Sequence, residues 1–249
     1  MLKGIFFDLY GTLLEFGDME KAWADWLHFF YISLKESGLK LLEKEFSQAC
    51  EGFFSLAEPE FADDSLTVFE KRIKSLCLSL KLIVNNEKIH SIADRIVPIW
   101  QKQVSLDPDA IPVLEKLQHS KNLALISNFD HPPHVRRLLQ ENGLEKYFSD
   151  ITISAEVGIK KPDPGIFHWS LLATRLGPDE IAYVGDTDAD IKAALAAGMQ
   201  PVLIRRKGKG TNDRYLDYQD KYRANNKMPE IDKYDDLVII TSLRELLSF

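Results

Sequence analysis

Cysteine is scarce in this chain, which contains only Cys50 and Cys77 among its 249 residues. Two cysteines are too few for a disulfide framework, and both lie among apolar neighbours at helical spacing. We therefore expect two packed thiols in a reducing compartment. The chain does not open with the basic segment and long apolar stretch of a secretory signal, so we expect a cytoplasmic protein.

Long apolar runs and an excess of basic residues are also lacking. No uninterrupted apolar run approaches the roughly 18 residues that a membrane-spanning helix needs. The formal net charge is -7, so long-range electrostatics repel nucleic acid and anionic lipid surfaces. Hydrophobic residues make up 45% of the chain and charged residues 28%, which is typical of globular proteins. We expect a monomer or a homodimer whose partner is a small metabolite rather than nucleic acid or a membrane.

Helical periodicity dominates the chain from Met19 to about Gln101. Apolar residues there recur three or four positions apart, in stripes that begin at Trp23 and Leu66. The pattern predicts four or five helices and no strands. The tryptophans in the first stripe are typical of a packed core.

Short apolar segments alternate with helical ones from about Leu106 onward. The segments "NLALISN", "SDITIS", "IAYVGD" and "QPVLIR" are typical of buried strands with helices between them. Such alternation indicates βαβ units and a parallel sheet. A further strand, "KGIFFDLY", is separated from them by the helical block. The sequence thus predicts an α/β, Rossmann-like core of residues 1–15 and 105–249, into which residues 16–104 are inserted as an all-helical domain.

Polar side chains follow the carboxyl ends of these predicted strands. Ligands bind outside that edge of a parallel sheet, and four separate segments place polar groups there. One aspartate in such a position is more often a turn or helix cap, but four converging segments are hard to attribute to capping. The residues are Asp8, Ser127, Asn128, Lys161, Asp186, Thr187, Asp188 and Asp190.

Four motifs in order along the chain resemble those of the haloacid dehalogenase superfamily of hydrolases: "FFDLYGTLL", "LISN", "KKPDP" and "VGDTDADIKAALAAGM". The resemblance covers essentially the whole chain and points to members with a helical cap inserted after the first motif. It implies that Asp8 is the nucleophile and that the Ser127 hydroxyl holds the transferring group. It further implies that Lys161 is the conserved base partner and that Asp186 and Asp190 belong to a metal site.

The charge at the expected site indicates a divalent cation. Asp8, Asp186 and Asp190 bring about three negative charges into one crevice, and Lys161 offsets one of them. Mg²⁺ favours carboxylate oxygens and neutralises charge in phosphoryl transfer, so it is the expected cofactor. The resemblance adds the backbone carbonyl of Tyr10 as a further metal ligand.

The remaining candidates for substrate binding keep two interpretations each. Thr12 either binds phosphate or closes the Gly-Thr turn, and Asn128 either binds a phosphate oxygen or fixes a turn through local bonds. His131 and His134 either touch the substrate or belong to a turn at a helix start. The basic run "RRKGKG" at 205–210 is either solvated surface or a site for an anionic tail of the ligand. The polar segment 207–232 indicates an extended surface loop, with an oligomer contact as the alternative.

Tyr10 departs from the resembling phosphatases, which usually carry an aspartate there that protonates the leaving oxygen and later activates water. Metal-independent 2-haloacid dehalogenases of the superfamily often carry tyrosine, but they generally lack the Gly-Asp found at residues 185 and 186. We hypothesise a Mg²⁺-dependent phosphatase that forms an aspartyl-phosphate on Asp8 and acts on a small phosphorylated metabolite, with Tyr10 among its catalytic residues. The alternatives are a metal-independent 2-haloacid dehalogenase and a weakly active or non-catalytic phosphate-binding member.

Overall fold

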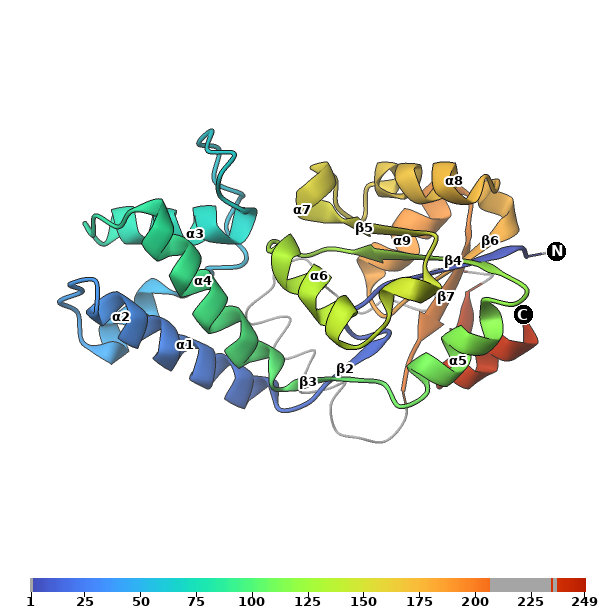
Figure 1. Ribbon diagram of the computed structural model, residues 1–249, viewed down its shortest axis with the longest axis horizontal. Coiled ribbons are helices and arrows are strands. Elements are labelled where there is room, and N and C mark those ends of the chain that lie inside the picture. The colour runs from blue at the N-terminus through green and yellow to red at the C-terminus, as the bar shows by residue number, and fades with distance from the viewer. Residues whose placement is uncertain (1, 207–233, 235–236) are drawn as a thin grey trace.

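The computed structural model describes residues 2–206, 234 and 237–249 of the chain. Its core is a six-stranded sheet with the order β5-β4-β1-β6-β7-β8 (Figure 1), in which all neighbouring strands are parallel. The predicted α/β fold with a parallel sheet is therefore confirmed. The strands are β1 (Gly4–Phe7), β4 (Asn122–Ser127), β5 (Asp150–Ile153), β6 (Ile181–Gly185), β7 (Gln200–Ile204) and β8 (Val238–Ile240).

Strand β1 lies in the middle of the sheet because both of its faces are apolar. Ile5 and Phe7 belong to a core cluster on one face, and Phe6 belongs to a second cluster on the other. This double burial explains why the strand appears in the sequence as an uninterrupted apolar run. The first face is covered by α5 (Ala110–Leu117), α6 (Pro132–Glu141) and the 3₁₀ segment η5 (Leu243–Ser248), and the second by α8 (His168–Thr174) and α9 (Asp188–Ala197).

Helices α1 to α4 form a group of their own beside the sheet (Figure 1). Buried aromatic rings make their core: the ring of Phe30 lies 5.2 Å from the ring of Trp26 and 5.2 Å from that of Phe46, measured between centroids. We propose residues 16–104 as a separate domain and call it the helical cap. Its helices are α1 (Met19–Lys35), α2 (Glu43–Ala49), α3 (Val68–Ser79) and α4 (Asn86–Gln101).

A two-stranded antiparallel ribbon connects the helical cap to the core. Strand β2 (Leu14–Phe16) pairs with β3 (Val104–Leu106), and Leu14 lies opposite Leu106. The ribbon brings the two connections of the helical cap together directly after the turn that follows Asp8. The sequence analysis did not predict it, because strands of three residues are too short to show alternation.

Several smaller features complete the described chain. Cys50 and Cys77 are buried and unpaired, as predicted, and burial raises the pKa of the Cys77 thiol to about 12. Within the described residues, no helix is both long and apolar enough to cross a membrane. The predicted surface loop at 207–232 lies outside the described residues. The remaining short segments are η1 (Glu145–Tyr147), α7 (Ser154–Val157), η2 (Pro164–Phe167) and η3 (Pro178–Glu180).

Candidate active site

The sheet brings the predicted site residues together at its carboxyl edge. Asp8 directly follows β1, Ser127 ends β4, and Asp186 directly follows β6. Strand β1 lies between β4 and β6, and their register aligns the three strand ends. Segments that are far apart in the sequence therefore present their polar residues to one crevice.

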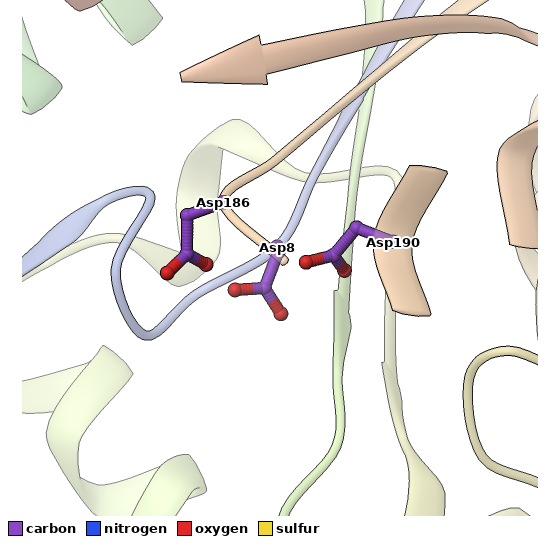
Figure 2. Close-up of side chains that lie close together, drawn as sticks. All are labelled: Asp8, Asp186 and Asp190. Atoms are coloured by element: carbon purple, nitrogen blue, oxygen red, sulfur yellow. The ribbon is translucent and has the colours of Figure 1, made fainter. Parts of the chain in front are cut away.

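Asp8, Asp186 and Asp190 form an acidic cluster in that crevice. One carboxylate oxygen from each lies within 4.8 Å of the others. Figure 2 shows the three side chains converging from the end of β1, the turn after β6 and the start of α9. Asp8 and Asp190 are buried and Asp186 is half-buried. Three carboxylate oxygens so close together suit a hard divalent cation such as Mg²⁺.

Lys161 reaches the same cluster from the loop after α7. Its Nζ lies 2.5 Å from Oδ1 of Asp8 and 2.7 Å from Oδ1 of Asp190. It also donates hydrogen bonds to the carbonyl oxygen of Ile126, at 3.1 Å, and to the hydroxyl of Tyr183, at 2.9 Å. The ammonium group is thus fixed between two of the three carboxylates.

Tyr183 and Thr187 support Asp190. Thr187 was expected at this edge of the sheet without a role, and Tyr183 was not predicted. The Tyr183 hydroxyl donates to Oδ1 of Asp190 at 3.2 Å. Thr187 donates to Oδ2 of Asp190 from its hydroxyl, at 2.5 Å, and from its backbone N–H, at 3.0 Å. Both oxygens of Asp190 are therefore engaged by the protein. The Thr-x-x-Asp capping box is a readable signal for Thr187, and Tyr183 has the only polar side-chain group in the strand "IAYVG".

Burial governs the ionisation of the cluster. It raises the pKa of Asp8 to about 6, although the Lys161 ammonium acts in the opposite direction. Burial and the charges of Asp8 and Asp190 raise the pKa of Asp186 well above its usual range. Burial also disfavours the charge on Lys161, but Asp190 and Asp8 outweigh it and raise the lysine pKa to about 12. One lysine does not neutralise three carboxylates, whereas a bound divalent cation would favour their ionised forms.

Three buried polar atoms at the site have no hydrogen-bond partner among the described residues: Thr12 Oγ1, Ser127 Oγ and Asp186 Oδ1. Buried polar atoms in native proteins are nearly always hydrogen-bonded, so a group without a partner marks a place where a ligand can supply one. The two hydroxyls can donate to an anion, and an ionised carboxylate oxygen can only accept or bind a cation. The donor set therefore fits Mg²⁺ next to a phosphate group.

Tyr10 contacts the helical cap. Its hydroxyl donates to Oε1 of Gln101, the last residue of α4, at 3.1 Å. Its ring stacks on Phe129 with centroids 5.0 Å apart, and its centroid lies 5.4 Å from that of Trp100. The phenol proton is thus engaged at the base of the helical cap, and the role of Tyr10 in catalysis stays a prediction.

Asn128 holds the backbone of Lys161 in place. Its Oδ1 accepts from the Lys161 N–H and its Nδ2 donates to the Lys161 carbonyl oxygen, both at 3.0 Å. Asn128 thus fixes backbone, as one of its two interpretations predicted, but the backbone is that of Lys161, which is distant in the sequence. The second hydrogen on Nδ2 is left for the proposed contact with phosphate.

Arg206 supports the turn after Asp8 and was not predicted. Its guanidinium donates to the carbonyl oxygens of Gly11, at 2.7 Å, and Thr12, at 2.5 Å. It also pairs with Asp107 at 2.5 Å, just beyond the ribbon strand β3. The interpretation of "RRKGKG" as solvated surface is therefore wrong for Arg206, and residues 207–210 lie outside the described residues.

His131 and His134 connect the core to the helical cap. Nδ1 of His131 lies 2.9 Å from the hydroxyl of Thr67, and Nε2 of His134 lies 3.0 Å from Oε1 of Gln101. Burial lowers the pKa of both imidazoles, that of His134 to about 4. Both rings are therefore neutral near pH 7.

Gly11 is required by the turn between Asp8 and the ribbon. Its φ of +91° lies in the left-handed region, and a Cβ there would collide with the Asp186 carboxylate. We expect Gly11→Ala to lower the free energy of unfolding by about 1–3 kcal/mol and to weaken Mg²⁺ binding about tenfold or more. Urea unfolding and calorimetric titration with Mg²⁺ measure the two effects.

Gly143→Ala is the matched control for that substitution. Gly143 also has a positive φ, +63°, but apart from its two chain neighbours no residue in the described part of the chain has an atom within 4 Å of its Cβ position. It should therefore show only the backbone cost, about 1 kcal/mol, and unchanged Mg²⁺ affinity. Equal losses of stability in the two variants, with Mg²⁺ affinity kept in both, would contradict the role given to Gly11.

A cavity of about 490 Å³ adjoins the site between the helical cap and the core. Asn128 and Lys161 line it on the core side, and Trp26 and Phe54 line it on the side of the helical cap. Its volume is within the usual range for small-molecule sites. The sequence analysis did not identify it, because its walls come from segments that are distant along the chain.

The fold agrees with the comparisons to known proteins. The chain belongs to the family of haloacid dehalogenase-like hydrolases, whose family model matches residues 2–198. A phosphoserine phosphatase from Thermus thermophilus is 38% identical over 43% of this chain and 43% of its own length. A glyceraldehyde 3-phosphate phosphatase from Methanopyrus kandleri is 37% identical over 56% of this chain and 57% of its own. The chain thus matches only about half the length of these two relatives.

Dehalogenases are among the similar proteins too. An (S)-2-haloacid dehalogenase 4A from Burkholderia cepacia is 24% identical over 83% of this chain and 84% of its own length. Among solved structures, a haloacid dehalogenase-type phosphatase from Thermococcus onnurineus has a TM-score of 0.62 and 22% identity, covering 99% of this chain and 97% of its own. A 2-haloacid dehalogenase from Pseudomonas syringae has a TM-score of 0.63 and 23% identity, covering 100% and 97%. At these identities the structural likeness shows the fold.

Proposed function

We propose that this protein is a Mg²⁺-dependent phosphatase that transfers the phosphoryl group of a small phosphorylated metabolite to Asp8 and then to water. The observation that carries the proposal is Asp186, whose carboxylate joins that of Asp8 and has a buried oxygen without a partner among the described residues. A metal-independent reaction on an anionic substrate has no use for a second carboxylate beside the nucleophile. A site that binds Mg²⁺ requires one.

In this proposal Asp8 and Asp186 hold the ion, together with the backbone carbonyl of Tyr10. Asp190, also a candidate ligand, has both oxygens engaged by Lys161, Tyr183 and Thr187, so we assign it to positioning Lys161. Bound Mg²⁺ supplies charge neutralisation for the carboxylates and the phosphoryl oxygens.

The protein's own groups then account for the first half of the reaction. The hydroxyls of Ser127 and Thr12, Nδ2 of Asn128 and the ammonium of Lys161 bind the phosphoryl oxygens. A carboxylate oxygen of Asp8 attacks phosphorus, and the bond between phosphorus and the leaving oxygen breaks. The leaving oxygen keeps the bonding electrons and takes a proton from water.

Water completes the cycle. It attacks the phosphorus of the aspartyl-phosphate, the bond to the Asp8 oxygen breaks, and inorganic phosphate leaves with the carboxylate restored. A general acid and base is typically worth about 10²–10⁴-fold in rate, and Tyr10 replaces the carboxylate that supplies it in the resembling phosphatases. We therefore propose slow dephosphorylation and a preference for leaving groups that need little protonation.

Phosphate release from an aryl phosphate, with Mg²⁺ and with EDTA, tests this function. We expect EDTA to lower the rate at least about 100-fold, because the charge of the carboxylates and the phosphate is then uncompensated. Thermal unfolding gives a second readout: Mg²⁺ should stabilise the wild-type protein but not Asp186→Asn. Equal rates with Mg²⁺ and EDTA would contradict the metal-dependent reaction.

A metal-independent 2-haloacid dehalogenase is the second candidate, favoured by Tyr10 and by the dehalogenases among the similar proteins. Halide release from 2-chloropropionate in the same preparation distinguishes the two. Halide release that persists in EDTA would favour the dehalogenase. Binding of Mg²⁺ and phosphate without turnover would instead favour a non-catalytic member.

The setting of the reaction is also part of the proposal. Two buried, unpaired cysteines support a reducing location such as the cytoplasm. The net charge of -7 supports a small metabolite rather than nucleic acid as the partner.

A further inference from the structure

Aromatic rings form much of the wall of the cavity beside Lys161. They come from α1, the segment before α3, α3 itself, α4 and the loop after β4. Three of them, Phe54, Trp100 and Phe129, are partly exposed, while the other two are buried behind them. The five rings are those of Trp26, Phe54, Phe69, Trp100 and Phe129.

These rings form an apolar part of the cavity wall. Phe54 lies 5.4 Å from Trp26 and 6.2 Å from Phe69, measured between ring centroids. Trp100 lies 6.3 Å from Phe129. An aromatic ring entering this space finds both faces and edges to pack against, at the separations that aromatic pairs prefer.

Charged groups at the cavity are already paired. Arg72 lies 2.8 Å from Asp130, and Lys192 lies 2.5 Å from Asp188. Lys160 is likewise paired, with Glu58 at 2.8 Å. Each lysine and arginine among the described lining residues thus has a carboxylate partner, and Lys161 has two, Asp8 and Asp190.

His131 also lines the cavity, and burial keeps its ring neutral by lowering its pKa. Within the part of the chain that the structure describes, the walls therefore provide no unpaired cation for a second anionic group beside the phosphate. Substrates such as phosphorylated hydroxy acids or amino acids would place a carboxylate against apolar or already neutralised groups, which is unfavourable.

Tyr10 supplies an independent argument about the leaving group. The Tyr10 hydroxyl donates a hydrogen bond to Gln101, so it is poorly placed to protonate an alkoxide leaving group. A phenol leaves as a phenolate with a pKa of about 10, like that of tyrosine, and so needs much less help than an aliphatic alcohol.

From these observations we infer that the cavity binds the leaving group as an uncharged aromatic ring and that the substrate is an aryl phosphate monoester. This inference rests on the proposed phosphatase function. The aryl-phosphate inference depends on the cavity walls around Phe54, Trp100 and Phe129. It can therefore be wrong even if the protein is a phosphatase.

Three phosphate esters and one acyl phosphate separate the effect of the ring from that of the leaving group. Phenyl phosphate has a ring and a good leaving group, and benzyl phosphate has a ring and a poor one. Acetyl phosphate has a good leaving group without a ring, and phosphoglycolate has a second anionic group without a ring. With KM taken from single-turnover rates, we expect KM for both ring-bearing compounds to be at least about tenfold lower than for the other two. The single-turnover rate of aspartyl-phosphate formation, rather than kcat, should follow the leaving group.

Phe54→Ala tests the wall directly, and Phe54→Leu removes the ring while keeping most of the packing volume. Both should raise KM for phenyl and benzyl phosphate about tenfold and leave KM for acetyl phosphate unchanged. Trp169→Ala is the matched control, because Trp169 is a 39% exposed aromatic on α8 that does not line the cavity. Thermal unfolding of each variant verifies that it is folded.

Two results would overturn the inference. One is equal KM for compounds with and without a ring, while hydrolysis still needs Mg²⁺ and Asp8. The proposed phosphatase function would then hold and the aryl-phosphate inference would be wrong. If no ester is hydrolysed, the proposed function fails, and calorimetric titration with 2-naphthol, with glycerol as the comparison, tests the cavity alone. Naphthol binding that is lost in Phe54→Ala would support a ring site, and no naphthol binding would overturn it.

Discussion

Asp8→Asn is expected to lower the rate of phosphate release by at least about 10⁴-fold. A carboxamide carries no anionic oxygen with which to attack phosphorus, so the aspartyl-phosphate cannot form. The side chain keeps nearly the same shape, and Lys161 retains Asp190 at 2.7 Å. Removing one of the three clustered carboxylate charges should not lower the melting temperature measured without Mg²⁺. The rate with Mg²⁺ and the melting temperature, measured on one preparation, therefore separate chemistry from folding.

Asp94→Asn serves as the control for that substitution. Asp94 lies on α4 with its side chain 60% exposed, and its nearest ion-pair partner among the described residues is Arg137 at 3.7 Å. We expect an unchanged rate. Radiolabelled phosphate should be trapped on the wild-type protein and on Asp94→Asn but not on Asp8→Asn. A few per cent of the wild-type rate remaining in Asp8→Asn would mean that water or another residue attacks phosphorus.

The site was predictable from the sequence where a residue's position follows from the geometry of one strand. Asp8 and Asp186 directly follow buried apolar strands, and parallel pairing of β1 with β6 then fixes them as neighbours. The fold was predictable for the same reason, because strands buried on both faces and helices with apolar stripes have different periods. The predictions of the fold and of the site support each other, since the order of strands in the sheet determines which strand ends are neighbours.

Residues that act through long side chains or backbone acceptors were not predictable in this way. Tyr183 follows the strand pattern as a buried aromatic residue, and nothing in that pattern says that its hydroxyl reaches Lys161 and Asp190. Arg206 stands in a basic run, but its acceptors are the carbonyl oxygens of Gly11 and Thr12, which every residue type carries. Such contacts depend on tertiary distances and not on local spacing.

The cavity shows the same limit for apolar residues. Trp26 was interpreted as core, and with an exposed fraction of 2% it is core, yet it also lines the cavity. Periodicity assigns a ring to the inner face of a helix, but whether that face meets protein or a void is decided by the opposing segments. The base of the cavity depends on Phe129, which follows β4, and on Trp100 near the end of α4.

Lys161→Met should have the largest effect on stability. The lysine side chain is 3% exposed and pairs with Asp8 and Asp190. Removing one partner of a buried ion pair typically costs about 3–5 kcal/mol, because the other charge stays buried without compensation. We expect a loss of that size in the free energy of unfolding at pH 7 without Mg²⁺, measured with urea. Lys88→Met, which removes a lysine paired with Glu36 at the surface, should change it by about 0.5 kcal/mol or less.

The pH dependence distinguishes lost charge pairing from lost packing. Burial already raises the pKa of Asp8 to about 6 in the presence of Lys161, and removing the ammonium raises it further. A carboxyl group whose folded pKa lies above its unfolded value of about 3.9 stabilises the fold at low pH and loses that contribution as the pH rises through the folded pKa. The difference between Lys161→Met and wild type should therefore be small near pH 4 and grow toward pH 7, where Mg²⁺ should reduce it again. A difference that is the same at both pH values would show that the methylenes of Lys161 matter for packing and that its charge does not hold the carboxylates together.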